Sequence, residues 1–470
     1  MSDSEKLKKG ISLIFGVNML AMVFSLLMNF LLPKFLNLNT YAAIQSYNLY
    51  VGFSGLFTLG FTDGIYLKYG GDSLGRIDSS ELKNDLSTFR LFQSCLIILG
   101  ILLYIFTKDI VILFAGLAIF PLNMTSFFSL LFQATGEFER YSKITGLKAT
   151  IVFGVNVLLL LISIVFSYED SLLFLILYLI VNVAYWILLE KSFTSLGNGI
   201  ELKCFNLKSW IENIKSGISL TLGTFASVLF TSIDRWYIKV LLNNTAFAYY
   251  SFAVSIDNFL NTAISPVTIT LYNYLCNNRE SVQVKRLRRY IVIFTTALAS
   301  CSFGAKFIIN YFIPKYNPAV EVLFWLFAGK ILYVIIQAIY VNLYKALKKQ
   351  NIYFRNLVIV TVANILINYL LFLFIRTSVA FAIGTMISNG LWFVLCVSDL
   401  KEFRPTINEY FYILVMIVIL LFCGIKINAI IGFIIYLISA FLLAIVIMKE
   451  EVISLLKQLI NIGARRIKNV

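Results

Sequence analysis

The sequence predicts an all-α polytopic membrane protein with about fourteen transmembrane helices, arranged as two pseudo-symmetric six-helix lobes plus two C-terminal helices. Composition is the first reason: of 470 residues, 60% are hydrophobic and 13% are charged, and mean hydropathy is +0.86. Soluble domains carry about 25% charged residues, so this chain has too little polar surface to face water on all sides. The other two reasons are a series of span-length apolar stretches and a weak internal repeat.

Each predicted span is an apolar stretch of about 20 residues, the length that a helix needs to cross roughly 30 Å of hydrocarbon. The first stretch follows MSDSEKLKKG without a small-residue cleavage site, so we expect it to be retained as a span. The predicted spans are 10–32, 41–62, 88–106, 110–134, 144–166, 171–190, 217–241, 246–275, 290–312, 319–345, 354–374, 378–398, 407–425 and 428–448.

Lysine and arginine are concentrated at both ends of the chain and in alternate connections, for example Lys285, Arg286, Arg288 and Arg289. The positive-inside rule therefore predicts that both termini and all the longer loops are cytoplasmic. The same bias accounts for most of the net charge of +15, which we assign to topology beside anionic lipid rather than to nucleic-acid binding.

A weak internal repeat supports two lobes. KGISLIFG at 9–16 resembles SGISLTLG at 216–223, and NTYAAIQSY at 39–47 resembles NTAFAYYSF at 244–252. A third echo links LFQATGEFERY with LYKALKKQNIY. An even number of spans in each lobe makes the repeat parallel, which is the architecture of alternating-access transporters. The expected parts are a first six-helix lobe at 1–200, a second at 201–400, two extra helices at 401–448 and a cytoplasmic basic amphipathic tail at 449–470.

Several chemistries are excluded by composition. The chain has no histidine, and its six cysteines form no CxxC pair, which removes histidine-based catalysis and the usual zinc sites. No phosphate-binding glycine motif is present, and every outer connection is only a few residues long. We therefore expect a non-enzyme with no catalytic residues, no metal and no cofactor, with H⁺ or Na⁺ coupling left open.

Charged residues inside the predicted spans are the candidate functional groups, because each costs about 2.5–3.5 kcal/mol on insertion scales and so usually faces a cavity or a partner. The first lobe offers mainly amides and is expected to hold no buried arginine or lysine, which would make any basic cavity one-sided. The candidates are Asp234, Arg235, Lys239, Asp257, Lys306 and Lys330.

Lys330 begins a polar stripe along one predicted span. Tyr333, Gln337 and Tyr340 follow it at helical spacing, so the four side chains share one face of the span. One cation beside an amide and aromatic rings suits a sugar-phosphate ligand. The alternative for the tyrosines is hydrogen bonding between helices.

Arg235 and Lys239 are four residues apart, so they lie together and repel each other. An anion between them would relieve that repulsion. Alternatively, both lie near the outer boundary and extend their charged ends to water, with Asp234 as a partner of Arg235.

Asp257 and Asn261 form the acidic part of the candidate site. Asp257 is a candidate coupling carboxylate for H⁺ or Na⁺, with Asn261 four residues further along the same helical face. The alternative is a buried salt bridge from Asp257 to Arg235, Lys306 or Lys330.

Three stretches carry a resemblance to a known family. They are LLPKFLNLNTYAAIQSY to LFTLGFTDGIYLKYGG at 31–71, LFQATGEFERYSKI at 131–144 and SIDRWYIKVLLNNTAFAYYSFAVSI at 232–256. With the six-plus-six-plus-two pattern, the chain resembles the multidrug/oligosaccharidyl-lipid/polysaccharide exporter superfamily, which has a MATE-like fold. Within it, the chain looks like the Wzx-type flippases for O-antigen and capsule repeat units.

The resemblance implies a bacterial inner-membrane protein that moves an undecaprenyl-pyrophosphate-linked oligosaccharide to the outer leaflet. It implies that Arg235 and Lys330, with Lys306, hold the pyrophosphate. The partners it implies are membrane lipids, the lipid-linked oligosaccharide and polysaccharide polymerase and ligase machinery, with the chain itself a monomer. The alternatives are a cation-coupled multidrug exporter of the same superfamily and a non-transporting membrane scaffold.

Overall fold

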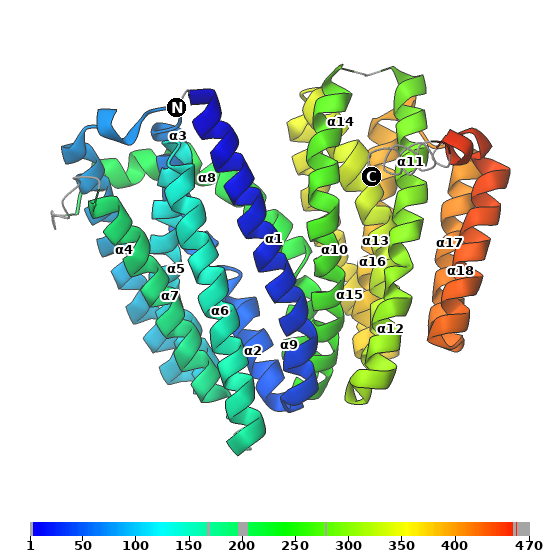
Figure 1. The fold of residues 1–470 in the computed structure, drawn as a ribbon, viewed down its shortest axis with the longest axis horizontal. Coiled ribbons are helices and arrows are strands. Elements are labelled where there is room, and N and C mark those ends of the chain that lie inside the picture. The colour runs from blue at the N-terminus through cyan, green and yellow to red at the C-terminus, as the bar shows by residue number, and fades with distance from the viewer. Residues whose placement is uncertain (1–2, 167–169, 196–204, 278–279, 455–456, 458–470) are drawn as a thin grey trace, which may run out of the picture. The chain divides into compact units, whose positions relative to one another are not determined.

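The structure is a computed structural model that describes residues 3–166, 170–195, 205–277, 280–454 and 457. Apart from connections and short 3₁₀ turns, the described chain is helical, and it contains no strand. Contacts between residues group the chain into two compact units, Met1–Ser232 and Ile233–Val470. Figure 1 follows the helices of both units by colour along the chain.

The first unit contains eight α-helices in its described residues, joined by the short 3₁₀ turns η1 (Ser54–Thr58) and η2 (Leu74–Arg76). The helices are α1 (Asp3–Phe35), α2 (Leu38–Val51), α3 (Phe61–Lys68), α4 (Ser79–Thr107), α5 (Ile110–Ala134), α6 (Phe138–Phe166), α7 (Ser171–Thr194) and α8 (Leu207–Phe230).

The second unit also consists of α-helices in its described residues, with a π-helical segment, η4 (Ile336–Val341), between α13 and α14. Its helices are α9 (Ile233–Leu241), α10 (Asn244–Asn277), α11 (Ser281–Ala299), α12 (Cys301–Phe312), α13 (Ala319–Ile335), α14 (Asn342–Ala346), α15 (Gln350–Ile375), α16 (Ser378–Asp399), α17 (Ile407–Lys426) and α18 (Ala429–Ile447).

The number of spans agrees with an all-α polytopic membrane protein. Eleven described helical stretches are long and apolar enough to cross a bilayer, or twelve if α8 and α9 count as one broken span. The two other predicted spans, 41–62 and 246–275, also fall on helices. The first of these is interrupted, because Leu59 and Gly60 both adopt positive φ angles between η1 and α3.

Polar residues at the membrane ends fix where the helices begin. The side-chain oxygens of Asp109, Asp170 and Asn206 accept hydrogen bonds from backbone amides in the first turns of α5, α7 and α8. Asp78 does the same for α4, and Asn428 for α18. Such caps satisfy amides that have no partner within the helix, which ends the apolar stretches at defined residues.

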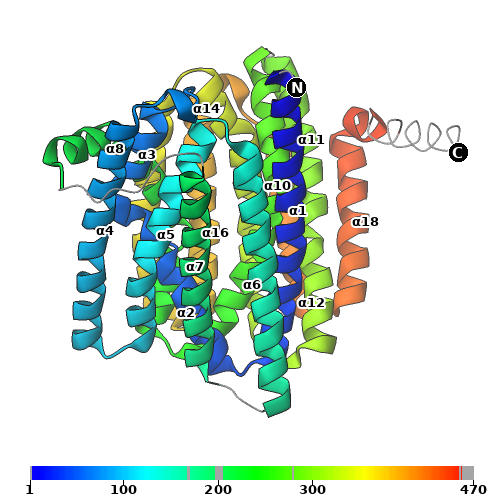
Figure 2. The same cartoon turned by 60° about the vertical axis from the view of Figure 1, so that its left-hand side comes forward.

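Small and aromatic residues pack the first unit. Figure 2 shows α4, α5 and α7 side by side, and each of the pairs α4–α5 and α5–α7 is in extensive contact. Gly100 of α4 faces Gly116 of α5 so closely that a β-carbon on either would collide with the other's backbone. Elsewhere, the rings of Phe24 on α1 and Phe153 on α6 stack at 4.1 Å. Such close helix packing is typical of membrane proteins.

The helix α13 is the packing centre of the second unit. It contacts α10, α11, α16 and α17, and most of the stretch from 319 to 346 is buried. Trp392 on α16 is almost fully buried and lies against the ring of Tyr333 on α13. Polar side chains on α13 are therefore held inside the unit rather than at its lipid-facing surface.

The helix α8 packs with the first unit. Gly60 and Gly64 at α3 lie against the backbone of α8 around Gly217, and Thr221 of α8 donates a hydrogen bond to Asp63 of α3. The compact units therefore divide between Ser232 and Ile233, whereas the predicted six-helix lobes divide at residue 200. The lobe assignment from the repeat stays a prediction, and most of the predicted tail at 449–470 lies outside the described residues.

Candidate functional site

Lys330 and Asp257 form a buried ion pair in the second unit. The Lys330 Nζ on α13 lies 2.7 Å from the Asp257 Oδ2 on α10, and the two side chains are 9% and 15% exposed. The other carboxylate oxygen, Asp257 Oδ1, is buried and accepts no hydrogen bond from the described residues. The pair therefore retains an acceptor that a proton or a further donor could use.

One aromatic ring lies beside the Lys330 ammonium. Its Nζ lies 5.0 Å from the centre of the Tyr333 ring, within the range of a cation–π interaction. The Tyr333 ring contacts Trp392, and Trp392 in turn contacts Tyr353. Gln337, one turn further along the helix, is partly buried. The structure thus brings together the predicted residues Lys330, Asp257 and Tyr333.

Tyr340 is directed elsewhere. It is fully buried, and its hydroxyl donates to the backbone carbonyl of Phe403 at 3.3 Å. Asn261 donates to Asn258 at 3.2 Å on the exposed side of α10. Neither side chain makes a polar contact with the Lys330–Asp257 pair among the described residues. Of the tyrosines in the predicted stripe, Tyr333 therefore lies beside Lys330, whereas Tyr340 binds the backbone at Phe403.

Asp234, Arg235 and Lys239 lie on the short helix α9. The buried Asp234 carboxylate accepts hydrogen bonds from the Tyr250 hydroxyl at 2.5 Å and from the Arg235 amide at 2.7 Å. Lys239 Nζ lies 3.3 Å from Asn244 Oδ1 and above the Phe247 ring. Asp234 is thus joined to α10 through a tyrosine, while Lys239 interacts with residues at the start of α10.

Lys306 interacts with the end of another helix. Its Nζ donates to the carbonyls of Gly424 at 2.6 Å and Ile427 at 2.5 Å, where α17 ends. Carbonyls in the last turn of a helix have no partner within the helix, and a cation there also compensates the helix dipole. In this structure Lys306 stabilises the α12–α17 contact and does not meet Lys330.

The first unit contains buried cations that sequence reasoning missed. Arg90 of α4 pairs with Glu190 of α7 at 2.5 Å, and both side chains are mostly buried. Lys148 of α6 lines a cavity and lies 4.4 Å from the centre of the Tyr185 ring. The expectation of a first lobe without buried arginine or lysine is wrong, because Arg90 and Lys148 lie near the starts of the predicted spans 88–106 and 144–166 and interact inside the unit rather than at the membrane boundary.

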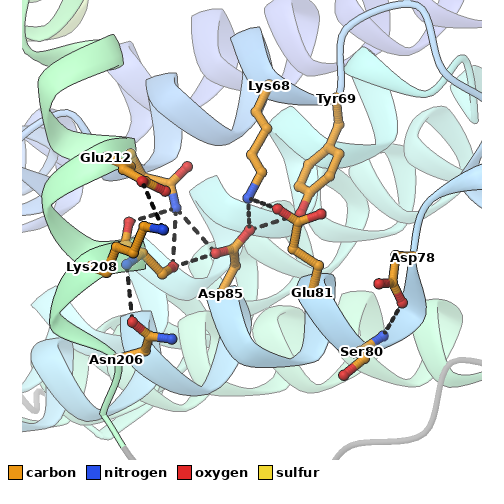
Figure 3. A network of polar contacts seen from close by, with 11 residues as sticks. Lys68, Tyr69, Asp78, Ser80, Glu81, Asp85, Asn206, Lys208 and Glu212 are labelled. Carbon is orange, nitrogen blue, oxygen red and sulfur yellow. Dashed lines mark hydrogen bonds and ion pairs between the residues drawn. The ribbon is translucent and has the colours of Figure 1, made fainter.

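A carboxylate network joins α3, α4 and α8 at one end of the first unit (Figure 3). Asp85 is fully buried; its Oδ2 lies 2.7 Å from the Lys68 ammonium and also accepts from the Tyr69 hydroxyl. Its Oδ1 accepts from the Ser209 hydroxyl and from the Asn213 amide. Four donors on two other helical segments therefore converge on one side chain of α4.

The same network shifts two pKa values outside the spans. Burial lowers the pKa of Lys68, but its contacts with Asp85 and Glu81 outweigh burial, so the pKa lies above its usual value. Burial, together with the charge of Asp85, raises the pKa of Tyr69. Both groups are therefore held in their protonated forms at neutral pH.

A second buried network stabilises the other unit. Glu409 of α17 is fully buried between Arg288 at 2.7 Å and Arg289 at 2.8 Å, and Arg289 also contacts Glu451 at 3.1 Å. Arg288 further donates to the carbonyl of Phe403. These contacts join α11, α17 and the residues after α18, so the network serves the packing of the unit.

The fold is similar to that of solved membrane transporter structures. No protein-family model and no curated protein matches the sequence. Among solved structures, the chain is similar to lipid II flippase MurJ in an inward closed conformation, with a TM-score of 0.67 and 12% identity over 94% of this chain and 99% of that chain. It is also similar to the eukaryotic MATE transporter AtDTX14, with a TM-score of 0.52 and 15% identity over 85% of this chain and 95% of that chain. These likenesses confirm the predicted fold, an all-α polytopic membrane protein with a MATE-like arrangement of helices.

Proposed function

We propose that this chain is a lipid-linked oligosaccharide flippase, which moves undecaprenyl-pyrophosphate-linked glycan repeat units from the inner to the outer leaflet for surface polysaccharide biosynthesis. The observation that carries the proposal is the Lys330–Asp257 pair, buried among apolar helices. Charged side chains are costly within a membrane and usually serve a substrate or ion pathway. The fold shared with the MurJ structure supports a lipid-linked cargo.

The pair suggests how an anionic head group binds. A pyrophosphate oxygen competes with Asp257 for the Lys330 ammonium, and the ring of Tyr333 beside the ammonium offers a surface for the first sugar. Once Asp257 loses its cationic partner, its carboxylate is left without that counter-charge inside the unit. This makes Asp257 the candidate group for coupling transport to H⁺ or Na⁺.

The lipid tail stays in the bilayer while the head group crosses through the protein. In this proposal the protein lies in a bacterial inner membrane with both termini in the cytoplasm, and polymerase and ligase machinery consumes the product at the outer face. No chemical bond is made or broken, so the chain acts as a transporter rather than as an enzyme.

The second candidate is a cation-coupled multidrug exporter, in which a cationic cargo takes Asp257 and displaces Lys330. The likeness to AtDTX14 favours it, although with a lower TM-score than the likeness to MurJ. An anionic cargo agrees better with the basic side chains Lys330 and Arg235 in the second unit. A scaffold without transport leaves the buried pair unexplained.

The test is made in a strain that lacks this chain, by measuring the amount and the leaflet of polyprenyl-linked repeat units. Intact units are expected to accumulate on the cytoplasmic leaflet while surface polysaccharide is lost. Wild type and Lys345→Met, which changes an exposed lysine of α14, are expected to restore transport. Lys330→Met is expected to fail in transport per membrane-inserted molecule, so its activity is normalised to the amount of protein in the membrane.

Other outcomes would contradict the proposal. An unchanged pool with raised sensitivity to cationic dyes would favour the multidrug exporter. Units that accumulate on the outer leaflet would show that flipping does not need this chain. Full transport by Lys330→Met would remove Lys330 from the head-group site.

A further inference from the structure

A polar-lined cavity lies among the helices of the first unit. It has a volume of about 500 Å³ and lies between α1, α2, α5, α6 and α7. Its size is within the range of small-molecule binding sites. Five of its lining side chains are carboxamides, and one is a cation: Asn29, Gln45, Asn48, Asn156, Asn182 and Lys148.

Lys148 enters this cavity without a counter-ion. Its Nζ interacts with the face of the Tyr185 ring at 4.4 Å, and among the described residues it forms no ion pair. The cavity lining itself contains no aspartate or glutamate. Other inward-facing cations are partnered, as Arg90 is by Glu190 and Lys330 by Asp257. An unpaired ammonium within membrane-spanning helices indicates an anionic ligand.

The amides supply the complementary part of the site. Tyr178 donates to Asn156 at 2.6 Å, and Asn182 donates to the Tyr47 hydroxyl at 3.1 Å, so these two amides are oriented by tyrosines. Gln45 and Asn29 make no side-chain hydrogen bond within the described part of the chain. A carboxamide both donates and accepts, which matches the hydroxyl groups of a sugar.

We propose that this cavity binds a carbohydrate carrying one anionic group, with Lys148 pairing the anion and the carboxamides holding the sugar hydroxyls. The anionic group is a phosphate or a carboxylate, since both present oxygen acceptors to an ammonium. The inference rests on the proposed function for its biological role, because the proposed cargo carries both sugars and an anionic group.

Binding is measured with the full-length chain in lipid nanodiscs, using three radiolabelled probes. Glucose 1-phosphate supplies a sugar phosphate, glucuronic acid supplies an acidic sugar, and glucose is the neutral reference. All measurements are made in a Lys330→Met background, so that the proposed head-group site does not contribute. The second substitutions are Lys148→Met, Lys148→Arg and Lys143→Met; Lys143 is an exposed lysine of the same helix, paired with Glu139.

We expect Lys148→Met to weaken binding of a charged probe about ten-fold or more, with Lys148→Arg and Lys143→Met close to the parent. Glucose is expected to bind more weakly and equally to all variants. If only glucose 1-phosphate binding depends on Lys148, the anionic group is assigned as a phosphate; if only glucuronic acid binding depends on it, the group is a carboxylate.

The proposal is overturned if neither charged probe binds the parent, or if Lys148→Met binds like the parent. Because this readout is binding in a Lys330→Met background, a negative result would leave the flippase proposal standing. Conversely, repeat units that cross normally without the chain would refute the flippase while Lys148-dependent binding could still hold.

Discussion

The ammonium of Lys330 lies 2.7 Å from a carboxylate oxygen of Asp257, which is 73 residues earlier in the chain. The pair joins α10 to α13, two helices of the second unit that are in extensive contact. A buried pair of this kind is most costly when one partner is removed, since the other is left charged and unpaired.

The first prediction concerns a double-mutant cycle on this pair. Asp257→Asn and Lys330→Met are each expected to lower the stability of the purified protein, by about 3–5 kcal/mol where the remaining charge stays buried. The double variant is expected to be more stable than the sum of the two losses predicts. Thermal unfolding in detergent measures the coupling, and additive losses would show that the two charges do not interact.

The second prediction separates Lys306 from Lys330. Lys306→Met removes two hydrogen bonds to the end of α17 and leaves the carbonyls of Gly424 and Ile427 without that donor. We expect a loss of about 1–3 kcal/mol in stability, while transport per folded molecule is unchanged. Leaflet assays normalised to membrane-inserted protein check this. A transport defect as large as that of Lys330→Met, with normal stability, would make Lys306 a substrate contact.

The third prediction tests the close approach of α3 and α8. A β-carbon at Gly217 would collide with the backbone at Gly60 and Gly64, whereas one at Gly223 of the same helix meets nothing within 4 Å. Gly217→Ala is therefore expected to lower stability by about 1–3 kcal/mol. Gly223→Ala is the matched control and is expected to be neutral or slightly stabilising, because alanine favours a helix. Equal effects of the two changes on the melting temperature would argue against this contact.

The fourth prediction concerns alkaline pH and Lys68. Its folded pKa is raised above the ordinary value of 10.5, so its contribution to stability is fully present below that pH and is lost as pH rises through the folded pKa. The raised pKa of Tyr69 acts in the same direction. The difference in melting temperature between wild type and Lys68→Met is expected to be largest at neutral pH and to shrink above pH 10.5. Lys208→Met, at an exposed position of α8, should show no such dependence.

The sequence predicted the helices well because span-length apolar stretches leave few alternatives. It predicted their starts poorly, since α4 and α6 extend into polar sequence at Ser79 and Phe138. Arg90 and Lys148 both fall near the starts of predicted spans, 88–106 and 144–166, where a basic residue at the membrane boundary looks the same in sequence as a buried one. The extra turns of α4 are stabilised by the Asp78 cap and by the ion pair between Asp85 and Lys68, which lies 17 positions earlier in the chain.

The candidate site was predicted in part. Helical spacing placed Lys330 and Tyr333 on one face, and their interaction follows from that spacing. The partner of Asp257 was left open between three cations, because the choice depends on how α10 packs against α13. Spacing also grouped Tyr340 with Lys330, although the hydroxyl of Tyr340 is directed to Phe403. Both the partner of Asp257 and the direction of Tyr340 depend on tertiary contacts, which helical spacing does not specify.

The attachment of α8 to α3 has a consequence for dividing the chain into fragments. A cut at the repeat boundary near residue 200 would separate Gly217 of α8 from the α3 backbone that it packs against. It would also separate Ser209 and Asn213 from their hydrogen-bond partner Asp85. A cut after Ser232 keeps these contacts within one polypeptide. Co-expressed halves of this protein should therefore be divided between Ser232 and Ile233. The boundary of the sequence repeat, near residue 200, is not the boundary of the compact units.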